Sequence, residues 1–174
     1  MITIYVDTET SGLRPPQSVI LEVAAVAVRD DQELGSFAAL VNPGVDVLTS
    51  SETAKALEIN KLDKQELAAA SPAGYVAEQF KQWLMQWGPA SLWAFNTQFD
   101  SGFLAQKPWE ISKLCWGGCV MKQLAGKERY IKLSKCAERF ALAWDGEAHR
   151  ALTDARMAFK VHRAYLKHNG LVRV

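Results

Sequence analysis

Residues 1–13 read MITIYVDTETSGL, and this opening stretch decides how the rest of the chain is interpreted. Its first seven residues are rich in β-branched and aromatic side chains, which favours a strand over Met1–Asp7. Asp7 and Glu9 are two positions apart, so on an extended chain both side chains point to the same face. Neighbouring carboxylates repel each other. Alone, such a pair marks the start of a loop more often than a metal site.

Two later segments carry acids in a comparable setting. Asp100 ends the stretch AFNTQFD, at the turn that follows the short strand predicted over Ser91–Phe95. Ligands of α/β proteins bind at such strand ends. Asp154 ends the stretch HRALTD, which begins at His149. Five residues along a helix rotate by roughly 140°, so we expect His149 on the loop before the helix and Asp154 in its first turns.

Four carboxylates gathered in one cleft would repel each other severely unless cations neutralised them. The four are Asp7, Glu9, Asp100 and Asp154, and together they predict a divalent metal site. Hard carboxylate oxygens favour Mg²⁺ or Mn²⁺ over zinc. A lone loop histidine is more often exposed and idle, but beside such a site His149 predicts phosphodiester chemistry.

Length and composition are those of one globular domain, residues 1–174, with 49% apolar and 22% charged residues. No stretch approaches the roughly 18 apolar residues of a membrane span, and the N-terminus lacks a secretory signal pattern. Cys115, Cys119 and Cys136 are too few for a disulfide framework, so a reduced, cytoplasmic location is expected. Their spacing is weak evidence for zinc, and buried or half-buried thiols are the better interpretation.

The net charge of +1 conceals an asymmetry between the two parts of the chain. Residues 1–106 carry 6 Lys and Arg against 13 Asp and Glu, whereas residues 107–174 carry 14 against 6. Charge alone does not decide whether these cations solvate helices or bind a polyanion. Beside an acidic metal cleft, the basic part more plausibly follows a phosphate backbone.

The remaining pattern predicts an α/β domain with a mixed sheet that starts as an antiparallel meander. A loop is expected over Thr10–Ser18, where glycine and two prolines occur. Trp83 and Trp87 are spaced as core residues of a helix that starts at Ser71-Pro72. The other predicted elements are strands over Val19–Arg29 and Glu33–Val41 and helices over Leu133–Leu142 and Arg150–Lys167.

On these motifs the sequence resembles the DEDDh branch of the DnaQ-like 3′→5′ exonucleases, part of the ribonuclease H-like superfamily. The matching segments are Asp7–Leu13, Asn96–Asp100 and His149 with Asp154, and the histidine distinguishes this branch from one that carries tyrosine. The resemblance covers nearly the whole chain. It implies a ribonuclease H-like fold, with a mixed central sheet flanked by helices.

The resemblance also implies a two-metal mechanism. Asp7, Glu9 and Asp154 would hold one Mg²⁺ or Mn²⁺ ion, and Asp7 would be shared with a second ion that Asp100 reaches directly or through water. His149 would take a proton from the attacking water. The expected reaction releases nucleoside 5′-monophosphates from the 3′ end of DNA, most readily single-stranded DNA.

A further set of residues is implied to contact the 3′-terminal nucleotide. Leu13 would act as a wedge beside the terminal base, although a leucine at a loop start could equally belong to the core. Phe99 is expected either to stack on a base or, as phenylalanine more commonly does, to pack in the core. Ser11 departs from the threonine usual in the family but keeps a hydroxyl. The full set is Thr10, Ser11, Gly12, Leu13, Ile59, Asn96 and Phe99.

Two other functions remain open at the level of sequence. An exoribonuclease that trims RNA or oligoribonucleotides would use the same acids, because discrimination depends on contacts to the 2′-hydroxyl. A non-catalytic subunit bound to a polymerase would keep the fold for its surface, but it would not need the complete set of acids. The expected partners are therefore nucleic acid and, as a further expectation, a DNA polymerase or repair protein. No membrane partner is expected.

Overall fold

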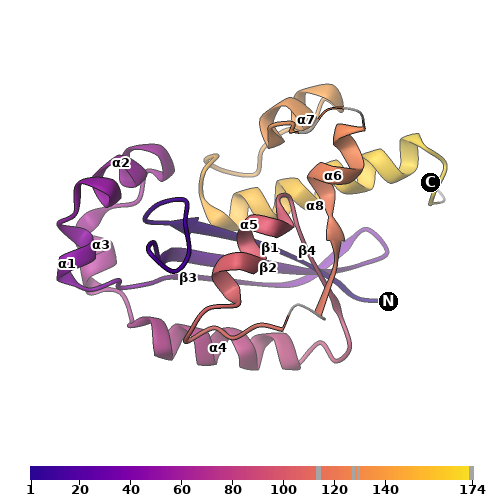
Figure 1. The fold of residues 1–174 in the computed structure, drawn as a ribbon. Coiled ribbons are helices and arrows are strands. Elements are labelled where there is room, and N and C mark those ends of the chain that lie inside the picture. The colour runs from indigo at the N-terminus through magenta and orange to yellow at the C-terminus, as the bar shows by residue number, and fades with distance from the viewer. Residues whose placement is uncertain (113–114, 127, 129, 173–174) are drawn as a thin grey trace.

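The computed structural model describes residues 1–112, 115–126, 128 and 130–172, which form a mixed five-stranded sheet flanked by helices (Figure 1). The strand order is β3-β2-β1-β4-β5. Neighbours among the first three strands of the chain are antiparallel, whereas β4 and β5 are parallel to β1. The strands are β1 (Thr3–Thr10), β2 (Ile20–Arg29), β3 (Gln32–Leu40), β4 (Ser91–Ala94) and β5 (Trp116–Cys119). The predicted α/β class and antiparallel start are confirmed.

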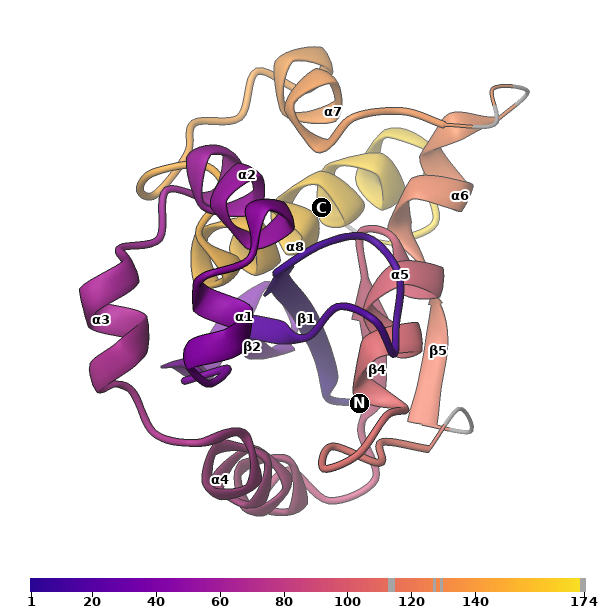
Figure 2. The same ribbon diagram turned by 60° about the vertical axis from the view of Figure 1, so that its left-hand side comes forward.

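Two long helices cover opposite faces of this sheet, and shorter helices surround its edges (Figures 1 and 2). The two long helices are α4 (Ala73–Met85) and α8 (Ala151–His168). The shorter helices are α1 (Val45–Leu48), α2 (Ser51–Asn60), α3 (Lys64–Ala69), α5 (Thr97–Leu104), α6 (Val120–Ala125) and α7 (Leu133–Arg139). Within the described residues, no helix combines the length and the apolar character that crossing a membrane requires.

Alternation along β1 divides its side chains between the two faces of the sheet. Ile4 and Val6 are buried in the hydrophobic cluster that includes α4. Tyr5 is buried in the second cluster, with α8. Because side chains two positions apart share a face, Asp7 and Glu9 continue the α8 side of β1. The fold therefore presents both acids to the helix that carries the last predicted acid.

The aromatic residues of α4 belong to the core, as the sequence predicts. Phe80 is fully buried, and Trp83 and Trp87 are partly buried against the same cluster. The rings of Trp83 and Trp87 meet edge to face, with centroids 5.5 Å apart. Their packing leaves neither tryptophan as an open platform for bases.

Two boundary differences bear on the site. The first strand ends at Thr10 rather than Asp7, because Glu9 and Thr10 still pair with β2. Asp100 lies inside the first turn of α5 rather than in a turn before the helix, because the helix begins at Thr97. Away from the site, Pro72 is the N-cap of α4 and not its first helical residue. Elsewhere the predicted boundaries differ by at most three residues.

The cysteines are free thiols. Cys119 and Cys136 are buried, as predicted, and both pack in the cluster under α8. Cys115 is exposed, so the prediction of a buried or half-buried thiol is wrong at this position. It precedes β5, which is an edge strand of the sheet formed by the described residues.

Candidate active site

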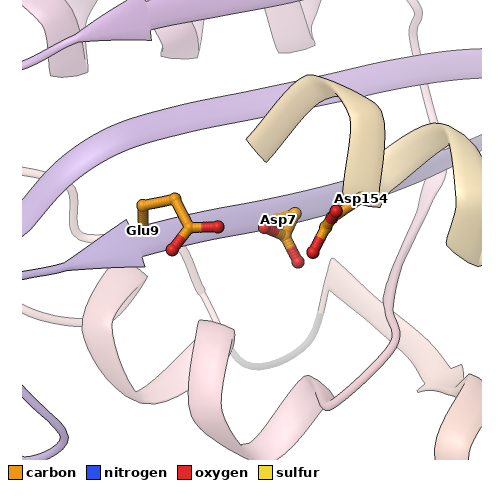
Figure 3. A group of neighbouring side chains, drawn as sticks. All are labelled: Asp7, Glu9 and Asp154. Carbon is orange, nitrogen blue, oxygen red and sulfur yellow. The ribbon is translucent and has the colours of Figure 1, made fainter. Parts of the chain in front are cut away.

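Three carboxylates from the two ends of the chain meet at the end of β1. Asp7 and Glu9 extend from the strand, and Asp154 extends from the first turn of α8 (Figure 3). One carboxylate oxygen from each lies within 4.8 Å of the others. Figure 3 shows the carboxylates of Asp7 and Asp154 pointing toward one another. The packing of α8 across β1 and β2 produces this meeting.

His149 lies on the loop before α8, as its spacing from the helical acid requires. It precedes the N-cap residue Arg150, is exposed, and has a left-handed backbone with φ of 67°. Few residues other than glycine adopt this conformation. Here it allows the backbone N–H of His149 to donate to Oδ1 of Asp154 at 3.1 Å. The loop is thus tied to the acid while the imidazole borders the same pocket.

Asp100 completes the set from α5. It is 3% exposed, and its Oδ1 accepts a hydrogen bond of 2.9 Å from the hydroxyl of Thr8. It is outside the group of three acids whose oxygens lie together, but it lines the same pocket. Thr8 was missed as a site residue. Its position between two acids on β1 is the signal that could have identified it.

Two adjoining cavities meet at these residues. The acidic pocket, about 380 Å³, contains the four acids and His149, with Tyr130, Lys132, Leu133 and Ser134 on another wall. The apolar pocket, about 360 Å³, is bounded mainly by the end of β1, the loop that follows it and α2. Glu9 and Phe99 line both cavities. A ligand that fills one can therefore continue into the other.

The residues predicted to contact the substrate line different pockets. The apolar pocket is lined by Thr10, Gly12, Leu13, Ile59 and Phe99, whereas Asn96 lines the acidic pocket. Leu13 is 78% exposed, so its alternative interpretation as a core residue is wrong.

Ser11 lines neither of these two pockets. Its buried hydroxyl accepts a hydrogen bond of 3.0 Å from the backbone N–H of Val19. The backbone N–H of Ser11 in turn donates to the Val19 carbonyl at 2.9 Å. These two bonds give Ser11 a place in the scaffold that closes the loop after β1.

The acids perturb one another strongly. Burial, together with the charges of the neighbouring carboxylates, raises the pKa of Asp7 well above its usual value. Burial and the charge of Asp154 raise the pKa of Glu9 to about 9. Burial raises the pKa of Asp100 to about 7 and that of Asp154 to about 6. Without cations, the site therefore retains protons at neutral pH.

A fifth carboxylate, Glu22, lies behind the site and was not identified from the sequence. It is paired with Glu9 across the β1–β2 ladder and is only 4% exposed. Arg150 binds both of its oxygens, with Nη2 at 2.9 Å from Oε1 and Nε at 3.2 Å from Oε2. The backbone N–H of Ala151 also donates to Oε2, at 3.0 Å. Glu22 thereby fixes the start of α8 against the sheet.

Asn60 supports Glu9 from the opposite side. It is the last residue of α2 and is 3% exposed. Its side chain forms a hydrogen bond to Glu9, which lowers the pKa of that acid and partly opposes the effect of burial. Asn60 follows the predicted pocket residue Ile59, so α2 contributes both an apolar wall and a polar support.

The donor set fits hard divalent cations. The three grouped residues offer carboxylate oxygens, which Mg²⁺ and Mn²⁺ prefer. Positive charge would also relieve the repulsion that raises the pKa values of these acids. Asp7, Glu9 and Asp154 are placed to share one ion.

A mixed sheet that carries such a carboxylate set at the end of its central strand, completed by the last helix, defines a metal-dependent nuclease site on a ribonuclease H-like fold. Residues 4–162 match the model of the RNase T family, described as an exonuclease. The chain therefore belongs to this exonuclease family, and its resemblance to the DnaQ-like enzymes is confirmed.

Bacterial proteins are among the relatives of this chain in sequence. A Mycobacterium tuberculosis protein named as a bifunctional exonuclease/endonuclease is 30% identical over 181 residues, which cover 96% of this chain and 27% of that protein. A PolC-type DNA polymerase III of Thermotoga petrophila is 25% identical over 169 residues, covering 94% of this chain and 12% of the polymerase. In PolC-type relatives from Listeria species the match covers only 6% of the polymerase. The chain thus spans a small part of these relatives.

Solved structures share the fold. Exonuclease X in complex with 5′ overhanging duplex DNA has a TM-score of 0.69 and 23% identity, with 97% of this chain and 93% of that chain covered. The nuclease domain of 3′hExo, a DEDDh family member bound to rAMP, has a TM-score of 0.74 and 16% identity, with 97% and 92% covered. The predicted ribonuclease H-like fold is therefore confirmed.

Proposed function

We propose that this protein is a 3′→5′ exonuclease that removes nucleotides from the 3′ end of DNA, with single strands as its preferred substrate, and releases nucleoside 5′-monophosphates. The observation that carries this function is the meeting of Asp7, Glu9 and Asp154 within 4.8 Å at the border of a nucleoside-sized apolar cavity. The cavity accepts the 3′-terminal nucleoside, and the acids lie beside the phosphodiester bond that joins this nucleoside to the rest of the strand.

The terminal nucleoside enters the apolar pocket. Leu13 and Ile59 are largely exposed there, at 78% and 65%, so a base that packs on them removes their apolar surface from water. Phe99 adds an aromatic ring at the border with the acidic pocket. A base held by these three side chains is recognised by its flat apolar face, which permits any of the four bases.

The acids hold the metal ions in this mechanism. Asp7, Glu9 and Asp154 would hold one ion, and Asp7 with Asp100 would hold a second. When bound, two divalent ions supply positive charge that stabilises the attacking and leaving oxygens of the phosphodiester. Thr8 and Asn60 orient Asp100 and Glu9, respectively, through the hydrogen bonds described above.

His149 acts as the general base. Its ring is exposed at the border of the acidic pocket, where a water molecule can reach it. The hydrogen bond from the backbone N–H of His149 to Asp154 fixes the loop. The imidazole is thereby held near the acids without being a metal ligand itself. The imidazole accepts the proton of the attacking water, which generates the nucleophile.

The choice of DNA is supported by the sequence relatives. The PolC-type relatives are named as DNA polymerases, and the resemblance to one of them extends over 94% of this chain. Structural neighbours do not discriminate, since one holds duplex DNA and another holds rAMP. The names of these relatives also support association with a DNA polymerase.

A substrate panel tests this function. Labelled single-stranded DNA, duplex DNA, RNA and a dinucleotide are incubated with Mg²⁺, Mn²⁺ or EDTA, and the products are sized. We expect mononucleotides from the 3′ end of DNA and none in EDTA, with Asp7→Ala as the inactive control. Faster cleavage of RNA would replace the substrate with RNA. No hydrolysis by folded protein, even of an activated nucleotide ester with Mn²⁺, would favour a non-catalytic role.

A further inference from the structure

The lysine and arginine side chains of α8 and of its N-cap residue are paired with acids of the protein itself. Each of them forms an ion pair with a carboxylate, and most of these carboxylates lie in the acidic part of the sequence. The pairs are Arg150–Glu22, Arg156–Glu33, Lys160–Asp145, Arg163–Asp31 and Lys167–Asp31. The excess charge that suggested a phosphate-binding surface is therefore neutralised along α8, and a nucleic acid must be held elsewhere.

Another wall of the acidic pocket retains a free cation. This wall, called here the α7 wall, consists of Tyr130, Lys132, Leu133 and Ser134. Lys132 is the N-cap residue of α7 and is exposed, and within the described part of the chain it forms no ion pair with a carboxylate. It borders the acids and yet remains available to an anionic ligand.

Local packing explains why this wall faces the pocket. Ile131 and Leu133 are partly buried against the core cluster under α8. In the extended segment before α7, the residues on either side of Ile131 alternate away from that core. Tyr130, 61% exposed, and Lys132 therefore border the acidic pocket. An aromatic ring and a cation two residues apart are suited to a nucleotide, the ring for its base and the cation for its phosphate.

The positions of α2 and of the α7 wall indicate the path of the nucleic-acid strand across the site. In Figure 1, α2, which borders the apolar pocket, lies apart from α7. A smaller cavity beside Leu13 is another exit, but it is lined by Pro15, Asn96, Gln98 and Phe99 and offers no cation. A phosphate backbone leaving the acids therefore gains most from the α7 wall.

We propose that the α7 wall binds the nucleotide on the 5′ side of the scissile bond, with Tyr130 stacking on the penultimate base and Lys132 contacting the next phosphate upstream. This assignment rests on the proposed exonuclease function, and it adds the direction in which the strand crosses the site. Ser134 supplies a hydroxyl beside the same phosphate.

The test of Lys132 compares two substrates that differ in upstream phosphates. A DNA oligonucleotide has them, whereas the p-nitrophenyl ester of thymidine 5′-monophosphate has only the reacting phosphodiester. We expect Lys132→Met to lower kcat/KM for the oligonucleotide at least about fivefold more than for the ester, mainly through KM. The salt dependence of oligonucleotide binding should lose about 0.7 from its log–log slope, the value of one contact to a single strand.

Lys135→Met is the matched control. Lys135 is on the same helix but is paired with Glu138 at 2.8 Å and does not line the acidic pocket. In Lys135→Met, the ratio of kcat/KM for the oligonucleotide to kcat/KM for the ester should stay within about twofold of the wild-type ratio. An equal loss of kcat/KM on both substrates in Lys132→Met would overturn the contact, and so would the same loss in Lys135→Met.

Gln98 lines the other exit from the site. A larger loss of oligonucleotide kcat/KM in Gln98→Leu than in Lys132→Met would also overturn the contact.

Tyr130 is tested with the base it is proposed to hold. Tyr130→Ala should weaken binding of an intact oligonucleotide by about 5- to 160-fold, the range for loss of one stacked base. It should have little further effect when the penultimate position is abasic. Equal losses on the intact and abasic strands would refute the stacking.

Failure of the proposed function is separable from failure of this inference. If the wild-type protein does not hydrolyse the ester with Mg²⁺ or Mn²⁺, the exonuclease function fails. Binding of a fluorescent oligonucleotide in Ca²⁺, measured by anisotropy, still tests the wall. Lys132→Met must then weaken binding and lower the salt slope, and unchanged values would reject the inference.

Discussion

The pairing of Glu22 with Arg150 offers the sharpest test of how the site is assembled. Glu22 is a buried acid, with a side chain only 5% exposed, that lies beside Glu9. Arg150 and the N–H of Ala151 are its partners. Replacing Arg150 by methionine would leave a buried carboxylate without its counter-charge, directly behind the metal-binding acids.

The magnitude follows from the exposure of the two partners. Removing one member of a fully buried pair costs about 3–5 kcal/mol. The Arg150 side chain is 37% exposed, so water screens part of the charge, and we expect a loss of about 2 kcal/mol. For a domain of this size that corresponds to a fall in Tm of about 4–8 °C.

Glu22→Gln should cost less than Arg150→Met. The amide oxygen can still accept from Ala151, and the half-exposed arginine can turn to water. The lost negative charge also relieves repulsion on Asp7, Glu9 and Asp154, each of whose pKa values Glu22 raises. The free energy of unfolding of the double variant should be close to that of Glu22→Gln, because without the Glu22 charge Arg150 no longer neutralises a buried carboxylate.

Urea unfolding of the four proteins in EDTA at pH 8 measures this cycle. Arg156→Met is the control, since its pair with Glu33 is about one-third exposed on both sides and should contribute less than about 1 kcal/mol. Arg150→Met should also lower kcat, because Arg150 connects His149 to α8. If Arg150→Met unfolds like the control, or the double variant is the least stable, the pair does not fix α8.

The other predictions concern the acids and two histidines. Asp7→Ala and Asp154→Ala should bind an oligonucleotide by anisotropy but lose hydrolysis by about 10³-fold or more, and near-wild-type cleavage would refute the site. His149→Ala should slow hydrolysis about 10²- to 10⁴-fold, and a collapse of Mg²⁺ affinity in calorimetry would refute its role as base. In EDTA, Tm should fall as pH rises from about 6 to 9, because folded Glu9, whose pKa is about 9, keeps a proton that the unfolded chain has released. Added Mg²⁺ should reverse this fall, and a flat profile would contradict the repulsion between the acids. Burial lowers the pKa of His162 to about 4, so its contribution to stability should be lost as pH falls from about 6.5 to 4. A His162→Gln variant that kept the same acid-dependent loss would rule this out.

Strong local patterns account for the elements that sequence predicts well. The helices α4 and α8 have the helical spacing of apolar residues that burial requires, and β2 is an almost continuous apolar run. The short helices α1, α2 and α3 lack such a pattern. They form where their few apolar residues, such as Leu48 and Leu67, reach a small separate cluster around Leu21.

The edge strand β5 could not be predicted from propensity. Its sequence Trp-Gly-Gly-Cys contains two glycines, which strands disfavour. The reason is tertiary: a Cβ at Gly117 or Gly118 would come within 2.5 Å of Trp93 on the neighbouring strand. Only glycine allows this strand to approach the tryptophan, and that information is not local.

Sequence spacing predicted His149 on the loop before α8 and Asp154 in the first turns of that helix, as the structure has them. Asp7 and Asp100 were expected at the end of a strand and in a turn, but they lie inside β1 and α5.

Sequence spacing missed Glu22, whose partner Arg150 is 128 residues away. One signal was present: Glu22 is the only charged residue in the apolar run Ile20–Val28. A lone acid in a buried strand needs a counter-charge, but its identity depends on tertiary packing.

The distribution of counter-charges explains why the site depends on added cations. Glu22 is neutralised within the protein by Arg150. Among the described residues, Asp7 and Glu9 form no ion pair with lysine or arginine, although their raised pKa values show how unfavourable their charges are. A lysine beside them would remove that repulsion and compete with the metal ions. Lys132 instead borders the pocket from the α7 wall without pairing to the acids, which leaves their oxygens for cations and its own charge for phosphate.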